Sequence, residues 1–152
     1  VPMDAEDIVN EIVESVVEAY RYTIPLKNGA KKYLEQKYKD GIQMCILTAS
    51  EADYIYPALD RLDIRKYFSH VLTCTELGKY KDDGAAYLSA MELMGGTLEE
   101  TVVFEDAYYA VKGAKSVGFS VYAVLDEVVR EDDIDKIKAT ADYCFHSYKE
   151  LL

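Results

Sequence analysis

Apolar residues near the start of the chain recur every three or four positions. Between residues 4 and 22, isoleucines and valines fall on one side of a helical projection and glutamates on the other, which predicts a helix with Asp4 as its N-cap. The apolar stripe could also serve as a contact face for a partner helix. Pro25 interrupts the pattern, and a second helix is predicted over residues 30–41, ended by a glycine.

After residue 41, one strand and one helix alternate repeatedly. Strands are predicted at 42–48, 70–74, 101–105, 119–125 and 143–145, and helices at 54–62, 87–94, 110–118 and 132–138, with capping-box patterns at 50–53 and 97–100. The first strand is almost continuously apolar, as in strands that are buried on both faces. Alternation at this spacing is typical of right-handed βαβ crossovers, so the pattern predicts an α/β fold with a mostly parallel sheet.

Composition narrows the possible partners. The 152 residues are half apolar and 30% charged, which indicates a globular chain of about one domain. The formal net charge of −11 argues against binding to nucleic acid or to an anionic membrane. A small phosphorylated ligand remains compatible with this charge, because acidic side chains can chelate a divalent cation locally.

The three cysteines are Cys45, Cys74 and Cys144, which are far apart and lie inside apolar runs. This spacing favours reduced core thiols in a cytoplasmic protein over a disulfide framework or a metal site. No apolar run approaches the ~20 residues of a membrane span, and no basic-then-apolar leader pattern opens the sequence.

Residues suited to phosphate and metal chemistry follow three of the predicted strands. They are Thr48, Ala49 and Ser50 after the first strand, Lys79 and Lys81 after the second, and Glu105 with Asp106 at the end of the third. Because the carboxyl ends of parallel strands share one edge of a sheet, these groups should meet. Hydroxyl and N–H groups at a helix start suit phosphate oxygens, lysine stabilises negative charge, and paired carboxylates hold Mg²⁺.

Each group also has a purely structural interpretation. Thr48 could cap the next helix with its hydroxyl, and Asp106 could cap the helix that follows its own strand. The two lysines could be solvated loop charges. The functional interpretation therefore depends on all three strand ends coming together.

Residues 25–152 resemble the haloacid dehalogenase superfamily, in its phosphoglycolate-phosphatase and β-phosphoglucomutase-like branch. Residues 45–50 are similar to the second motif of that family, and residues 103–107, with the helix that follows, to the fourth. The resemblance implies a Rossmann-like three-layer sandwich. It also implies phosphate binding by Thr48, Ala49 and Ser50, a Mg²⁺ site at Asp106 and Glu105, and a catalytic lysine. The register of the third motif falls on Lys81 rather than Lys79, although Asp82 and Gly84 replace its prolines.

The first motif of the family, a strand followed by Asp-x-Asp, is absent from the sequence. Its first aspartate is the nucleophile in the family, so the resemblance implies that this chain is inactive alone. Residues 1–24 resemble the last helix of a cap domain, and the chain looks like the carboxyl-terminal part of a longer protein. The absent strand would lie between the strands that end at Thr48 and at Glu105. We therefore expect an isolated chain to be oligomeric, for example by strand exchange, or partly disordered.

Three functional hypotheses follow. The first is a Mg²⁺-dependent phosphatase, or a phosphomutase, that acts on a small phosphorylated metabolite through an aspartyl-phosphate. The second is a naturally truncated, non-catalytic domain that binds a phosphorylated ligand or a partner protein. The third and weakest is a signalling receiver domain, whose acidic pocket, hydroxyl and lysine would have to occur in the reverse chain order.

Overall fold

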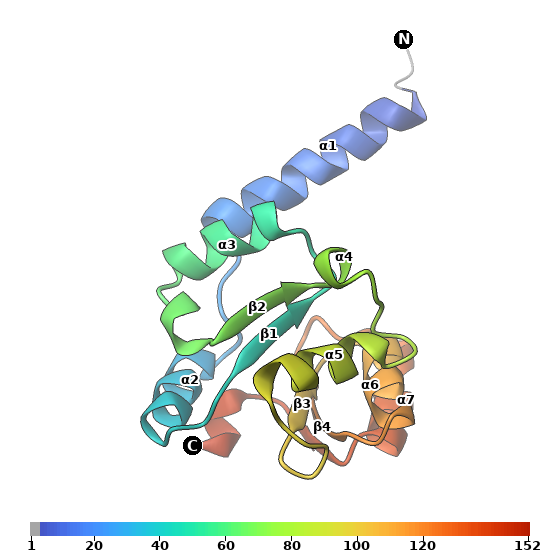
Figure 1. Ribbon diagram of the computed structural model, residues 1–152. Coiled ribbons are helices and arrows are strands. Elements are labelled where there is room, and N and C mark those ends of the chain that lie inside the picture. The colour runs from blue at the N-terminus through green and yellow to red at the C-terminus, as the bar shows by residue number, and fades with distance from the viewer. Residues whose placement is uncertain (1–3) are drawn as a thin grey trace.

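Short parallel strands form the centre of the molecule in a computed structural model, which describes residues 4–152 (Figure 1). The strands are β1 (Cys45–Thr48), β2 (His70–Thr73), β3 (Val102–Glu105), β4 (Ser120–Val124) and β5 (Tyr143–Phe145). The α-helices are α1 (Ala5–Glu18), α2 (Ala30–Lys39), α3 (Ala52–Arg61), α4 (Cys74–Leu77), α5 (Ala85–Met94), α6 (Tyr108–Ser116) and α7 (Glu131–Thr140). A π-helix, η1 (Ala19–Thr23), and two 3₁₀ turns, η2 (Arg65–Tyr67) and η3 (Tyr148–Leu151), complete the order.

All strand pairs are parallel, which confirms the predicted fold class. They form two sheets, β1–β2 and β3–β4–β5, and within residues 4–152 no ladder joins β1 to β3. In this described part of the chain, β1 and β3 each therefore have one edge without a ladder partner. The prediction of a strand buried on both faces is wrong for β1, whose four residues are each only partly buried. A strand that has a ladder partner on one side alone leaves its other edge accessible.

Helices cover both faces of the strands, giving the expected three layers. Alternation along β1 shows this directly, because Ile46 packs with α3 on one face and Leu47 packs with the α5 and α6 core on the other. The larger core gathers side chains from α5, α6, β4 and α7. An aromatic cluster fills the space between α2, the second sheet and η3; it consists of Tyr33, Phe104, Tyr122, Phe145 and Tyr148.

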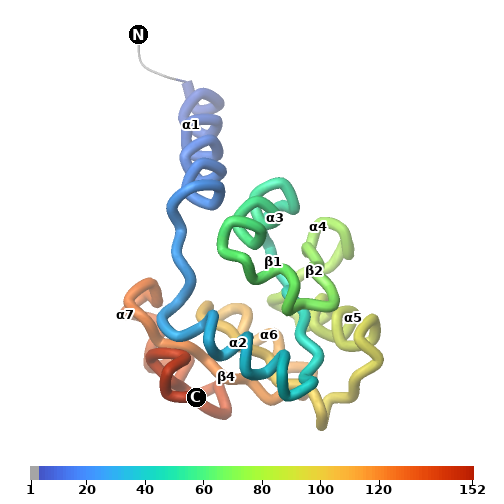
Figure 2. Tube along the Cα trace, turned by 90° about the vertical axis from the view of Figure 1, so that its left-hand side faces the viewer, coloured from blue at the N-terminus to red at the C-terminus, as the bar shows by residue number. Residues whose placement is uncertain are grey.

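The first helix projects away from the rest of the molecule, and an extended linker connects it to α2 (Figures 1 and 2). Asp4 caps α1 as predicted, with its Oδ1 accepting a hydrogen bond from the N–H of Asp7 at 2.9 Å. The apolar stripe of α1 is exposed along its length, with Ile12 58% accessible. Residues 1–3 of the predicted cap remnant, residues 1–24, lie outside the described part, and a domain boundary at residue 24 stays a prediction.

Neither of the two predicted capping boxes forms. Helix α3 begins one residue later than the pattern at residues 50–53 predicts, after Glu51, which makes no side-chain cap. The hydroxyl of Ser50 lies 3.3 Å from the hydroxyl of Tyr20. The pattern at residues 97–100 forms a turn rather than a helix start. A capping box does occur at Thr73 and Glu76, where the short helix α4 follows β2 directly. From the sequence, the residues of α4 were predicted as the end of a strand followed by a loop.

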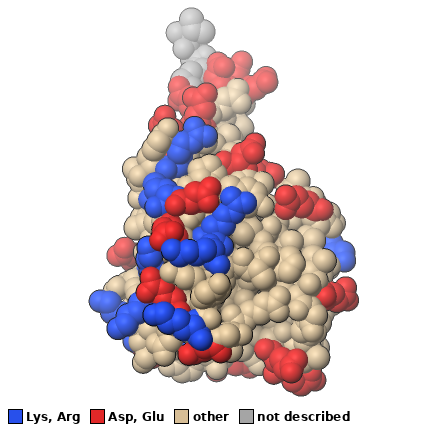
Figure 3. Space-filling model, turned by 60° about the vertical axis from the view of Figure 1, so that its left-hand side comes forward, with Lys and Arg blue, Asp and Glu red and all other residues tan. Residues whose placement is uncertain are grey.

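Charged side chains of both signs are interspersed on the face that Figure 3 shows, and acidic groups gather on the projecting helix. Several lysines and arginines of the described part of the chain are paired with aspartates, among them Lys31 with Asp63 and Arg65 with Asp60. Among residues 4–152, no helix is both long and apolar enough to cross a membrane. The three cysteines are free, and burial raises the pKa of the Cys45 thiol to about 11, so this thiol stays protonated near neutral pH.

Candidate functional site

The carboxyl end of β1 presents the first of the predicted phosphate-binding groups. The strand stops at Thr48, and the N–H of Ser50 donates a hydrogen bond of 3.0 Å to the Thr48 hydroxyl. Thr48 does not cap α3, because that helix starts after Glu51. The Thr48 proton and the exposed Ala49 backbone therefore remain available to a ligand at this edge.

The loop between α4 and α5 is fixed against α6 by two glycines. Gly84 has a φ of +82°, which proline cannot adopt, so the loop follows a path that the prolines of the family motif would not permit. A Cβ on Gly113 would overlap the carbonyl oxygen of Lys81. This close backbone approach sets the position of Lys81.

Lys81 and Tyr87 converge on Glu105. The Lys81 ammonium donates to Oε1 of Glu105 at 2.6 Å, and the Tyr87 hydroxyl donates to the same oxygen at 2.7 Å. The lysine and glutamate side chains are each only 10% exposed. Burial, followed by the negative charge of Glu105, raises the pKa of Tyr87, so its hydroxyl stays protonated and acts as a donor. Lys79 lies elsewhere, with its ammonium 2.6 Å from the hydroxyl of Ser89.

Asp106 points away from Glu105, as expected for neighbouring residues at the end of a strand. Its Oδ2 lies 3.0 Å from the ammonium of Lys27, which is also 2.6 Å from Oδ2 of Asp126 in the loop after β4. Burial alone would lower the pKa of Lys27, but its hydrogen bonds to Asp126 and Asp106 outweigh this effect and raise it. Asp106 does not cap α6, whose N-cap is Ala107 without a side-chain bond.

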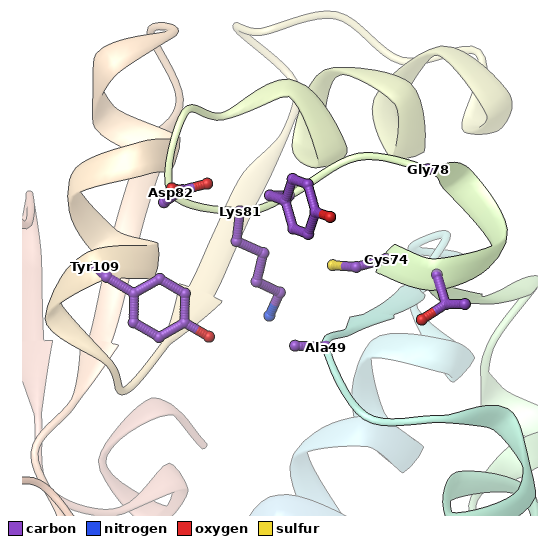
Figure 4. A pocket seen from close by; sticks show the side chains of 8 residues that line it. Ala49, Cys74, Gly78, Lys81, Asp82 and Tyr109 are labelled. Atoms are coloured by element: carbon purple, nitrogen blue, oxygen red, sulfur yellow. The ribbon is translucent and has the colours of Figure 1, made fainter.

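An open pocket of about 590 Å³ lies beside these strand ends. Its lining residues are Ala49, Cys74, Thr75, Gly78, Tyr80, Lys81, Asp82 and Tyr109. In Figure 4 the side chain of Lys81 extends from its loop toward the side where Ala49 lies, with Tyr109 of α6 opposite. Of the predicted site residues, Ala49 and Lys81 thus border this cavity, whereas its lining within residues 4–152 includes neither Thr48 nor Ser50 nor the two carboxylates that follow β3.

Glu105 and Asp106 are the predicted metal ligands. Carboxylate oxygens are donors that Mg²⁺ prefers, and this ion keeps several waters and often takes only one or two protein carboxylates. Within residues 4–152 no group of three or more Asp, Glu, His or Cys side chains clusters closely enough to hold a metal. Each of the two carboxylates is also engaged by a different lysine, Glu105 by Lys81 and Asp106 by Lys27.

Three residues that shape the site were missing from the sequence-based candidates. Tyr87 was assigned to a helix core, although a buried tyrosine hydroxyl usually needs a partner. Gly113 lies mid-helix, where a glycine often marks a close backbone approach. Lys27 gave no local signal at all, because its partner Asp126 is 99 positions away along the chain.

These features define a class of protein: a parallel α/β fold in which Lys81 pairs with Glu105 at the end of β3, Ala49 at the end of β1 lines the same pocket as Lys81, and Asp106 pairs with Lys27. The chain belongs to the haloacid dehalogenase-like hydrolase family, whose model matches residues 3–118. The family resemblance expected from the motifs is therefore confirmed.

Individual relatives agree with this assignment. The chain is 25% identical over 114 residues to a phosphoglycolate phosphatase of Pseudomonas putida, covering 75% of this chain and 42% of that protein. It is 31% identical over 98 residues to a phosphorylated carbohydrates phosphatase of Thermotoga maritima, covering 64% of this chain and 45% of the relative. The chain thus spans less than half the length of these two relatives.

Among solved structures, CbbY from Rhodobacter sphaeroides in complex with phosphate superposes with a TM-score of 0.80 at 19% identity. The match covers 99% of this chain and 67% of that one. At this identity the likeness shows the fold.

Proposed function

We propose that this chain forms part of a Mg²⁺-dependent phosphatase that acts on a small phosphorylated metabolite. The observation that carries the proposal is the Lys81–Glu105 ion pair, which is almost buried and lies beside a pocket that Ala49 also lines. A buried charged pair at the edge of a pocket is a costly arrangement, typical of a site that handles charge. The small phosphate esters named for the two curated relatives support this class of substrate.

Each residue has a distinct role in the proposal. Thr48, the Ala49 N–H and Ser50 hold phosphate oxygens, and Lys81 stabilises the negative charge that develops on the transferred group. Asp106 and Glu105 are the protein ligands of Mg²⁺, which when bound supplies further neutralisation of phosphoryl charge. The nucleophile is an aspartate outside these 152 residues, whose phosphorylated form is hydrolysed by water. A phosphomutase would use the same groups with a second substrate in place of water.

A non-catalytic, phosphate-binding domain is the second candidate. It is favoured by the pairing of Glu105 with Lys81 and of Asp106 with Lys27, because carboxylates that are already neutralised by lysines need no metal ion to balance their charge. We also propose a cytoplasmic location, on the basis of the three free thiols. Association into homo-oligomers is proposed from the open edges of β1 and β3.

The test uses the full-length gene product with a panel of small phosphomonoesters, phosphoglycolate and sugar phosphates included, in the presence of Mg²⁺. Lys81→Ala should lower kcat by about 10²–10³-fold, the usual effect of removing one charge-stabilising donor. Lys79→Ala is the matched control, since the Lys79 ammonium donates to the Ser89 hydroxyl and not to Glu105 or Asp106, and it should keep activity within about threefold. Equal losses in both variants would refute the assignment of Lys81.

A second pair of measurements separates the two candidate functions. Asp106→Asn should raise the Mg²⁺ concentration needed for half-maximal activity by about tenfold or more, because it removes one of two carboxylate ligands. Phosphate binding by a full-length protein that hydrolyses none of the esters would instead support the non-catalytic domain.

A further inference from the structure

Lys27 forms a bridge between two acidic strand ends. It lies in the linker between η1 and α2, and its ammonium contacts Asp106 after β3 and Asp126 after β4. All three side chains are partly buried, with exposed fractions of 30%, 38% and 21% respectively. We refer to this arrangement as the Lys27 bridge.

Both neighbours of Lys27 are held in place, so its position is not that of a free surface lysine. Leu26 packs into the apolar cluster that includes α3. The carbonyl of Asn28 accepts hydrogen bonds from the Tyr148 N–H at 2.9 Å and the Ser147 hydroxyl at 3.1 Å. With the backbone fixed on both sides, forming the bridge costs only the rotamer entropy of the Lys27 side chain and no further backbone entropy.

We propose that Lys27 is a positioning residue that competes with the divalent cation for Asp106. Without metal, its ammonium neutralises Asp106; when a cation binds, Asp126 retains the ammonium, which already lies closer to it. This inference rests on the proposed function, since it takes Asp106 to be a metal ligand. The bridge thereby sets the metal affinity of the site below that of the two carboxylates alone.

The competition follows from elementary electrostatics. A cation that approaches Asp106 must displace or repel the Lys27 ammonium, so part of the binding free energy is lost. The pairs are partly exposed, which limits the strength of each of them. Removing the ammonium should then tighten metal binding by about fivefold, equivalent to about 1 kcal/mol.

The experiment measures Mn²⁺ binding to the full-length protein by the EPR signal of the free ion, with Mg²⁺ as the competing ion. Lys27→Met should lower the Kd about fivefold, whereas Lys27→Arg, which keeps the charge, should stay within about twofold of the wild type. Lys31→Met is the matched control. It also removes one positive charge, but that of an exposed lysine whose ammonium lies 3.7 Å from Oδ2 of Asp63. It should shift the Kd less than twofold.

The outcomes separate the two proposals. Equal shifts in Lys27→Met and Lys31→Met, with binding abolished in Asp106→Asn, would overturn the role of Lys27 and leave the metal site intact. Mn²⁺ binding that persists unchanged in Asp106→Asn would overturn both. Should Lys27→Met fail to fold by circular dichroism, Lys27→Gln carries the same expectation. A merely structural role of Lys27 would change stability without this pattern of affinities.

Discussion

Replacing Tyr87 with phenylalanine removes one hydroxyl from the centre of the site and changes little else. The ring is 5% exposed and packs edge-on against Phe119, with 6.2 Å between ring centroids, and this packing is kept in the variant. The lost interaction is the 2.7 Å hydrogen bond to Glu105. Hydrogen bonds to charged groups contribute about 1.5–3 kcal/mol. Because Lys81 still donates to the same oxygen, we expect a loss near the lower end of this range, about 2 kcal/mol.

The variant also makes a prediction about pH. The pKa of Tyr87 is raised in the folded protein, so its neutral form contributes stability below the unfolded pKa of about 10. As the pH rises above that value, the unfolded chain loses the proton first and the contribution disappears. The stability difference between the wild type and Tyr87→Phe should therefore narrow by about 1.4 kcal/mol per pH unit above pH 10.

Urea unfolding of the full-length protein at one fixed protein concentration measures both effects, at pH 7.5 and between pH 9 and 11. Tyr109→Phe is the control, since Tyr109 is 50% exposed and should change stability by less than about 0.5 kcal/mol. A difference at pH 7.5 below about 0.5 kcal/mol, or one that stays constant to pH 11, would refute the proposed hydrogen bond and its consequence.

Three further predictions concern the packing of Gly113, the ionisation of Asp142 and the association of the isolated chain. Gly113→Ala should cost about 1–3 kcal/mol in urea unfolding despite the better helix propensity of alanine, because the new Cβ overlaps the Lys81 carbonyl; an unchanged midpoint would contradict this. Asp142→Asn tests the low pKa of Asp142, which the Lys115 ammonium and the Val121 N–H hold down. The wild type should be the more stable protein at pH 7, and its advantage should vanish as the pH falls from about 4 through the lowered pKa of the folded state, so a constant advantage at pH 2.5 would be the contrary result. Finally, light scattering should show the isolated chain to be oligomeric, or its spectra partly disordered, and a monodisperse monomer with a two-state melt would disprove that expectation.

Much of the fold followed from periodicity alone. The alternation of strands and helices predicted the parallel pairing, and Asp4 was correctly identified as a helix cap. These features depend on residues a few positions apart, where hydrophobic pattern and capping chemistry act directly. The capping box predicted at Ser50 did not form because α3 begins one residue later, after Glu51, and the Ser50 hydroxyl lies beside that of Tyr20, which is distant in sequence.

The candidate site was less accessible to sequence reasoning. The register of the third motif favoured Lys81, and the structure places Lys81 against Glu105 and Lys79 against Ser89. The sequence did not reveal that the side chains of Glu105 and Asp106 diverge. Each of these carboxylates meets a lysine from a different segment. Such partners are set by tertiary packing, which leaves no periodic pattern in the chain.

β1 and β3 each have one open edge with which a further strand could pair, and the register of that strand would matter to the site. Any extended segment that paired with both edges would join the two sheets, and its final residues would emerge between Thr48 and Glu105. A slip of one residue would turn its side chains to the opposite face, and a slip of two would move them by about 7 Å. The identity of the side chain delivered to the pocket would thus be decided by backbone hydrogen bonds made several residues away from it.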